Sequence, residues 1–118
     1  MGLTTVVLEI TNPEDQTKAV RGEFLVDSGA AYTVLPQRMV KKLDLKPDFK
    51  QQFSLADGRS ITRPVGSAYI KFGGRRTASP VVLGKAGDSP LLGVLTLEAM
   101  GLVLDPFERK LHPAKLVI

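Results

Sequence analysis

The chain has 118 residues, of which 43% are hydrophobic and 24% are charged, and its formal net charge is +4 at pH 7. This size and composition suit one ordinary globular domain, which we expect to span residues 1–118. Cysteine is absent and histidine occurs once, which excludes disulfides and thiol chemistry and disfavours a structural or catalytic zinc site. Carboxylates are the main candidate reactive groups, and we expect no metal and no cofactor.

The sequence carries no targeting or membrane signal. No apolar run approaches the roughly 18 residues of a membrane helix, and the N-terminus lacks the pattern of a secretory signal. We therefore expect a cytoplasmic chain without a membrane partner, which could still be a domain of a longer protein. A basic cluster at residues 38–50 is interrupted by Asp44 and Asp48. We interpret it as solvated surface and expect no nucleic-acid partner.

Alternating apolar and polar side chains predict a hairpin at the start of the chain. Residues 5–10 alternate as in a strand with one face in a core, and a turn-rich run follows at residues 12–15. A second alternating stretch covers residues 19–26, and the two strands should pair. The hairpin then leads directly into Asp27.

The middle of the chain predicts a short helix and a second hairpin. A strand at residues 33–35 ends at a proline, after which residues 37–43 place apolar side chains on one side and basic ones on the other, as in an amphipathic helix. Two extended runs, 51–55 and 59–72, meet at Ala56-Asp57-Gly58. Asp-Gly between alternating apolar residues is typical of a tight two-residue turn.

The C-terminal third predicts short alternating elements. A strand is expected at residues 77–83, and a short helix at 95–100 is closed by Gly101, a residue type that suits a helix C-terminus. A strand at 102–105, a turn, and an extended stretch at 110–118 follow. The last three residues are all apolar, which predicts an element of assembly because an unpaired apolar strand invites pairing.

Asp27 is the acid that the sequence singles out. The triplet Asp-Ser-Gly ordinarily forms a turn in which the acid caps nearby amides. Here the acid lies between an apolar strand ending at Val26 and a second apolar strand at residues 33–35, whereas polar turns usually join half-polar strands. Placing a carboxylate near a core carries a free-energy cost, so such an acid is a candidate for function.

Two motifs resemble the retropepsin-like, or retroviral-type, aspartic proteases of the pepsin clan. The first is LVDSGA at residues 25–30, followed by TVL at 33–35, and the second is LLG at 91–93, which opens a short helix. The resemblance covers nearly the whole chain. It implies an all-β acid protease fold, which is a small closed β-barrel with a flap hairpin and one or two short helices, assembled as a two-fold homodimer.

The resemblance also implies a function and its residues. It implies an aspartic endopeptidase in which a water is activated between Asp27 and its copy in a second subunit, because the chain holds only one Asp-Ser-Gly. The substrate is then a peptide or protein. Ser28, Gly29 and Ala30 support the acid. The flap and substrate-binding residues implied are Phe53, Leu55, Ala56, Asp57, Gly58, Ile61 and Leu91.

Other interpretations of the sequence stay open. The same fold can serve as a catalytically silent module that dimerises or binds an extended peptide, and measured cleavage distinguishes the two. A basic nucleic-acid-binding barrel predicts salt-sensitive binding of oligonucleotides. The single histidine, His112, has no acid or nucleophile at a useful spacing in the sequence. We therefore interpret it as an ordinary surface or packing residue.

Overall fold

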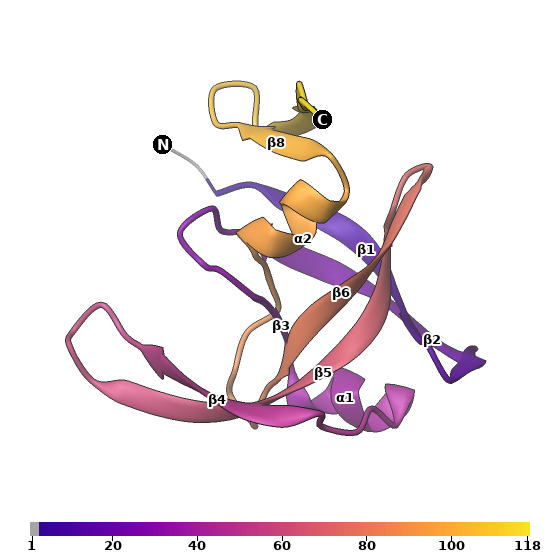
Figure 1. Cartoon of the computed structure of the whole chain (residues 1–118), viewed down its shortest axis with the longest axis vertical. Helices are drawn as coiled ribbons and strands as arrows, with labels where there is room; N and C mark the ends of the chain where they lie inside the picture. Colours follow the sequence, from indigo (N-terminus) through magenta and orange to yellow (C-terminus); the bar gives the residue numbers. More distant parts are fainter. Residues whose placement is uncertain (1–2) are drawn as a thin grey trace.

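The structure is a computed structural model that describes residues 3–118, and it consists mainly of β-strands with two short helices (Figure 1). The elements are, in order, β1 (Thr5–Asn12), β2 (Asp15–Val26), β3 (Thr33–Leu35), α1 (Gln37–Leu43), β4 (Phe49–Ser54), β5 (Ser60–Phe72), β6 (Arg75–Leu83), β7 (Leu91–Leu92), α2 (Val94–Ala99), β8 (Leu102–Asp105) and β9 (Lys110–Pro113). The prediction of an all-β chain with one or two short helices is confirmed.

The main sheet closes on itself. Its strand order is β1-β2-β7-β3-β6-β5-β4, and β1 also pairs with β5 through Ile10 and Ile70, which joins the two sides into a small barrel. Closure removes free strand edges from the barrel wall. The predicted first hairpin is present, although β2 begins at Asp15 because its early residues pair with β1 up to Asn12. The closed barrel is therefore confirmed.

The core follows from the alternation in the sequence. The fully buried apolar side chains come from six strands of the barrel and from α1, which lies against β2. They include Phe24, Leu8, Ile10, Leu35, Leu43, Ile70, Leu92, Val65 and Val81. Burying a side chain of this size contributes about 1.5–3 kcal/mol. Burial of these side chains is therefore the main favourable contribution to the free energy of folding the barrel.

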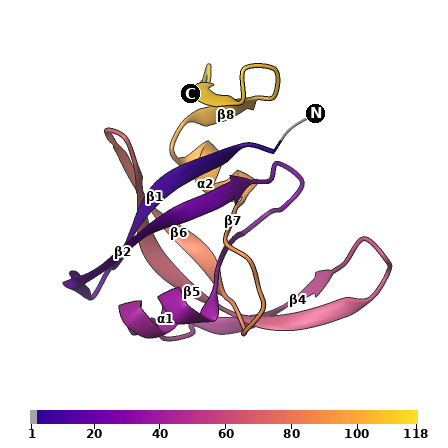
Figure 2. The same ribbon diagram turned by 180° about the vertical axis from the view of Figure 1, so that it is seen from behind.

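The short strand β7, labelled in Figure 2, lies between β2 and β3 in the sheet. Leu91 pairs with Leu25 in parallel and with Val34 in antiparallel orientation. The strands on either side of the Asp27 loop are therefore held apart by one inserted strand, which leads directly into α2. Because β7 pairs with both β2 and β3, both ends of the Asp27 loop are part of the barrel wall.

The turn between β4 and β5 differs from the predicted two-residue turn. The Leu55 amide donates to the Arg59 carbonyl at 2.7 Å, and the Gly58 amide donates to the Leu55 carbonyl at 3.0 Å, so residues 56–58 form the loop. Gly58 has φ of 88°, which favours glycine. A three-residue loop with a left-handed last residue is another common hairpin connection, and Asp57 caps it by accepting the Arg59 amide.

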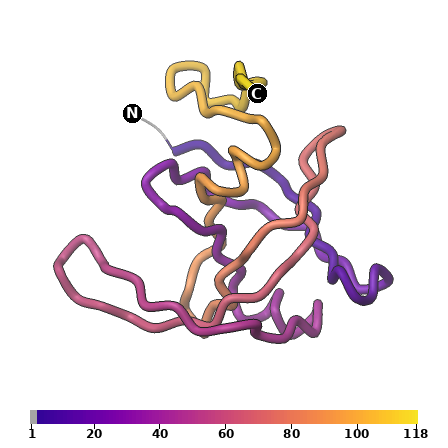
Figure 3. Tube along the Cα trace, in the orientation of Figure 1, coloured from indigo at the N-terminus to yellow at the C-terminus, as the bar shows by residue number. Residues whose placement is uncertain are grey.

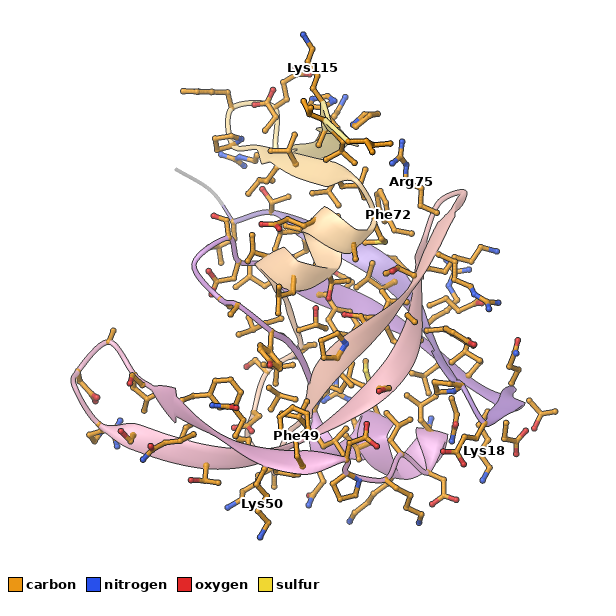
Figure 4. The ribbon with its side chains drawn as sticks, viewed as in Figure 1. Lys18, Phe49, Lys50, Phe72, Arg75 and Lys115 are labelled. Carbon is orange, nitrogen blue, oxygen red and sulfur yellow. The ribbon has the colours of Figure 1, made fainter. Side chains whose placement is uncertain are left out.

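The C-terminal region forms a separate two-stranded sheet of β8 and β9, next to α2 and to the N-terminal end of β1 in Figure 1. Arg75 of β6 reaches this region and donates to the Met100 carbonyl at 2.7 Å, at the C-terminal end of α2 (Figure 4). The predicted extended stretch 110–118 is only partly a strand: β9 ends at Pro113, and residues 114–118 form no strand with any part of residues 3–118.

Neither helix approaches the length of a bilayer-spanning segment. Over residues 3–118, α1 has seven residues and α2 has six, and no helix is long and apolar enough to cross a membrane.

Candidate active site

Asp27 is the first residue after β2, and its backbone is held from two directions. Its amide donates to the Leu92 carbonyl of β7 at 3.0 Å, and its carbonyl accepts the Ala30 amide at 3.1 Å. The side-chain oxygen Oδ1 accepts the Gly29 amide at 2.9 Å. Within residues 3–118, no hydrogen bond or ion pair engages the second oxygen, Oδ2. The acid is half-buried, with one oxygen fixed and one available.

The start of α2 supports the loop that carries the acid. The Val94 amide donates to the Ala30 carbonyl at 2.8 Å, and the Leu95 amide donates to the Ala31 carbonyl at 3.0 Å. These amides belong to the first turn of the helix, where no partner inside the helix exists. The two sequence motifs therefore meet in space, because the amides of the second satisfy the carbonyls of the first.

A buried set of hydroxyl groups lies behind the loop, and no pattern in the sequence predicts it. Thr96 of α2 shares hydrogen bonds with Thr33 of β3 at 2.6 Å and with Ser79 of β6 at 2.8 Å. Thr33 Oγ1 also accepts the Gly93 amide at 3.1 Å. All three hydroxyl side chains are at most 3% exposed. Satisfied buried polar groups fix a single arrangement, so this network sets the distance between the two motifs.

A cleft of about 590 Å³ lies between the Asp27 loop and the β4–β5 hairpin. Of the predicted site residues, six line it, and they are Gly29, Ala30, Phe53, Leu55, Ile61 and Leu91. Asp27 itself and the hairpin tip, Ala56, Asp57 and Gly58, lie outside the lining, and Ser28 lines a separate groove. The structure thus brings the loop and the inner side of the hairpin together and leaves the tip in solvent.

The hairpin curves along the same side of the molecule as the Asp27 loop (Figure 3). Phe53 of β4 meets Tyr32 in an edge-to-face contact with ring centroids 5.5 Å apart. Edge-to-face pairs of this kind are favourable because the ring edge is positive and the face negative. Tyr32 was not predicted as a site residue, yet it connects the loop to the hairpin across the cleft.

Arg63 and Asp88 also line the cleft and were not predicted. Arg63 Nε donates to Asp88 Oδ2 at 3.0 Å, and Arg63 Nη2 donates to Asp88 Oδ1 at 3.4 Å, so both carboxylate oxygens are engaged. The pair links β5 to the loop after β6. The hydrogen bond from Arg63 holds the pKa of Asp88 below its ordinary value of 3.8, and the Lys85 amide acts in the same direction.

The Asp88 pair predicts a pH-dependent contribution to stability. Because the pKa of Asp88 is lower in the folded than in the unfolded chain, the pair stabilises the fold above the unfolded value near 3.8, and this stabilisation is lost as the pH falls through the folded value. We expect Asp88→Asn to lower the unfolding free energy at pH 7 by about 1–2 kcal/mol. Urea unfolding of both proteins from pH 7 to pH 2.5 measures this, and a difference that does not shrink below pH 3.8 would contradict it.

The barrel, the Asp-Ser-Gly loop and the overlying hairpin together define an aspartic-protease type of domain. A sequence model of the aspartyl protease family matches residues 14–98, which is most of the chain. The chain belongs to the aspartyl protease family. A search of curated proteins found no match.

A solved structure supports the same fold. The structure described as EIAV protease complexed with the inhibitor HBY-793 aligns with a TM-score of 0.60 and 21% sequence identity, over 99% of this chain and 94% of that chain. Coverage of both chains is nearly complete, so the folds agree from end to end. The resemblance to retropepsin-like aspartic proteases is therefore confirmed at the level of family and fold.

Proposed function

We propose that the chain is an aspartic endopeptidase that acts as a homodimer, with Asp27 of each subunit forming the catalytic pair. The observation that carries the proposal is that no group among residues 3–118 engages Oδ2 of Asp27, whose loop also supplies Gly29 and Ala30 to the lining of the cleft. A carboxylate so placed can accept a proton from water, which is the first requirement for hydrolysis without a covalent intermediate.

The second acid has to come from another chain. Asp88 is the only acid among the described residues that line the cleft, and both of its oxygens are bound to Arg63. Asp57 lies at the hairpin tip and is paired with Arg59. A two-fold axis near Asp27 supplies the same acid a second time, since a two-fold interface presents the same surface from each subunit.

The surface beside Ser28 suits a second copy of this chain. Ser28 lines an apolar groove of about 320 Å³ together with residues of α2 and β8, among them Leu97, Val103 and Leu104. The start of β1 and the C-terminus lie at the same end (Figure 1). Large apolar side chains stand exposed in this terminal region, and they are Leu3, Val103, Phe107, Leu116, Val117 and Ile118. Exposed apolar surface of this kind marks interaction sites, and the single Asp-Ser-Gly of the chain argues for self-association.

The pair of acids performs the reaction by moving protons. One Asp27, ionised, takes a proton from a water held between the two, while the other, protonated, donates to the carbonyl oxygen of the peptide. The water oxygen bonds to the carbonyl carbon, and the resulting intermediate collapses when the C–N bond breaks and the amine takes up a proton. A peptide bound in the cleft displaces water from it, which strengthens each of these interactions.

The proposal is tested by peptide cleavage and association measured on the same samples. A mixed peptide library is incubated with the chain from pH 3 to pH 8, and sedimentation is run at the same concentrations. We expect cleavage that rises with the dimer fraction. A stable dimer that cleaves nothing at any pH would overturn the catalytic assignment and leave a peptide-binding module of the same fold.

Phe53 is expected to contribute to substrate binding. Phe53→Ala removes an aromatic wall of the cleft and its contact with Tyr32. We expect KM to rise by roughly tenfold with kcat retained, because burying a phenylalanine is worth about 1.5–3 kcal/mol and tenfold corresponds to about 1.4 kcal/mol. The matched control is Phe49→Ala on the same strand, whose side chain is half exposed and outside the cleft lining (Figure 4). Equal KM values for the two variants would contradict this role.

A further inference from the structure

The turn between β8 and β9 brings together three side chains that can bind a metal ion. They are Asp105, Glu108 and His112, and their nearest donor atoms all lie within 4.8 Å of one another. The sequence interpretation of His112 as a residue without a nearby acid is wrong. Residues that are three and seven positions apart become neighbours here because the chain reverses between Asp105 and Lys110.

The hairpin fixes the positions of these side chains. Asp105 pairs with Lys110, and Val103 pairs with His112, so Asp105 and His112 lie diagonally on the same face of the two strands. The opposite face, with Leu104 and Leu111, packs against the barrel core. The hairpin is therefore anchored from one side, and the three donors stand on the other.

Asp105 is oriented by the turn itself. Its Oδ1 accepts the Phe107 amide at 2.9 Å and the Glu108 amide at 3.1 Å, which leaves Oδ2 facing His112. Two carboxylates then approach the same imidazole nitrogen: Asp105 Oδ2 lies 3.5 Å and Glu108 Oε1 lies 3.6 Å from His112 Nε2. One of the two acids is held by backbone hydrogen bonds, so a bound ion would need little rearrangement of the turn.

These separations match the ligand spacing around a small ion. Bonds of about 2.0–2.2 Å from zinc to nitrogen and oxygen place two ligands of a tetrahedral ion about 3.4 Å apart. The measured 3.5 and 3.6 Å lie close to that value and are long for a hydrogen bond. The side chains of the three residues are between 28% and 59% exposed, so water can complete the coordination.

We propose that Asp105, Glu108 and His112 form a binding site for a divalent transition-metal ion of the zinc class, separate from Asp27. An imidazole with two carboxylates favours such ions over Mg²⁺ and Ca²⁺, which prefer oxygen ligands alone. The site holds the β8–β9 turn closed by joining its two strands through one ion. The metal is assigned to this turn and takes no part in peptide hydrolysis.

The test uses the full chain, free of any histidine tag, and Zn²⁺ as the probe. His112 is the only histidine, so its imidazole signals in the NMR spectrum are unambiguous. We expect them to shift on titration and to saturate at one ion per chain, with Mg²⁺ in large excess leaving them unchanged. No shift at a hundredfold excess of Zn²⁺ would overturn the proposal and leave a simple ion pair.

Variants assign the ligands by calorimetric titration. We expect Glu108→Gln and His112→Asn each to weaken Zn²⁺ binding by at least about tenfold, since even partners outside the coordination shell contribute that much in known sites. The matched control is Glu23→Gln, an exposed acid of β2. Asp27→Asn should also leave the affinity unchanged. If Asp27→Asn abolishes binding, or if His112→Asn does not weaken it, the assignment to this turn is wrong.

Discussion

Replacing Asp27 by asparagine is expected to abolish peptide hydrolysis and to leave the fold intact. Asparagine keeps the shape of the side chain, and its oxygen can still accept the Gly29 amide that Asp27 Oδ1 accepts at 2.9 Å. It cannot take a proton from water at any ordinary pH. Loss of a general acid or base lowers rates by roughly 10²–10⁴-fold, and a symmetric dimer loses both groups at once.

Activity and stability of the Asp27→Asn protein need to be measured together. We expect kcat/KM to fall by at least about 10²-fold. The unfolding free energy should change by less than about 1 kcal/mol, because asparagine keeps the hydrogen bond with the Gly29 amide. The matched control is Asp15→Asn in the β1–β2 hairpin, which lies outside the cleft lining. Substantial cleavage by the Asp27→Asn protein would remove this acid from the mechanism.

Gly93→Ala is expected to have the largest effect on stability. A Cβ at this position would lie 2.5 Å from the Tyr32 carbonyl oxygen and 2.8 Å from the Thr33 amide nitrogen. Both are backbone atoms, held by the pairing of β3 and by the buried Thr33 hydroxyl, so neither can move away easily. Overpacking of this kind costs about 1–3 kcal/mol and occasionally more, and we expect about 3 kcal/mol.

Any loss of stability in Gly93→Ala comes from steric contact and not from an unfavourable backbone conformation. Gly93 has φ of −92°, which alanine adopts readily, so only the lack of space opposes the substitution. Gly74→Ala is the matched control, because nothing lies within 4 Å of its added Cβ and its φ is not positive. Urea unfolding measures both variants. If Gly93→Ala proves as stable as Gly74→Ala, the two motifs do not pack as closely as described.

The sequence was informative where the pattern is local. Alternation over residues 5–10 and 19–26 predicted the first hairpin, and the amphipathic pattern predicted α1 with the bounds that it has, Gln37–Leu43. The LVDSGA run and the later LLG indicated the family through their resemblance to the retropepsin-like proteases. Each of these features depends on neighbours in the chain, which the sequence displays directly.

Features that depend on distant residues could not be predicted. β7 has two residues, too few for any periodicity, and its place between β2 and β3 comes from the closing of the barrel. The Arg63–Asp88 pair joins residues 25 positions apart. Two carboxylates lie close to His112 only because the chain turns back on itself at Asp105, which caps that turn. Alternation along β5 does place Arg63 on the same side as Ile61, a signal that could have identified it.

The most direct test of the shared site mixes wild-type and Asp27→Asn subunits at a fixed total concentration and lets them exchange. If each active site takes one Asp27 from each subunit, only wild-type pairs cleave, and activity follows the square of the wild-type fraction. Equal amounts then give roughly a quarter of the wild-type activity. A linear dependence, with half the activity at equal amounts, would mean that each chain carries a complete site and would contradict the proposed dimeric mechanism.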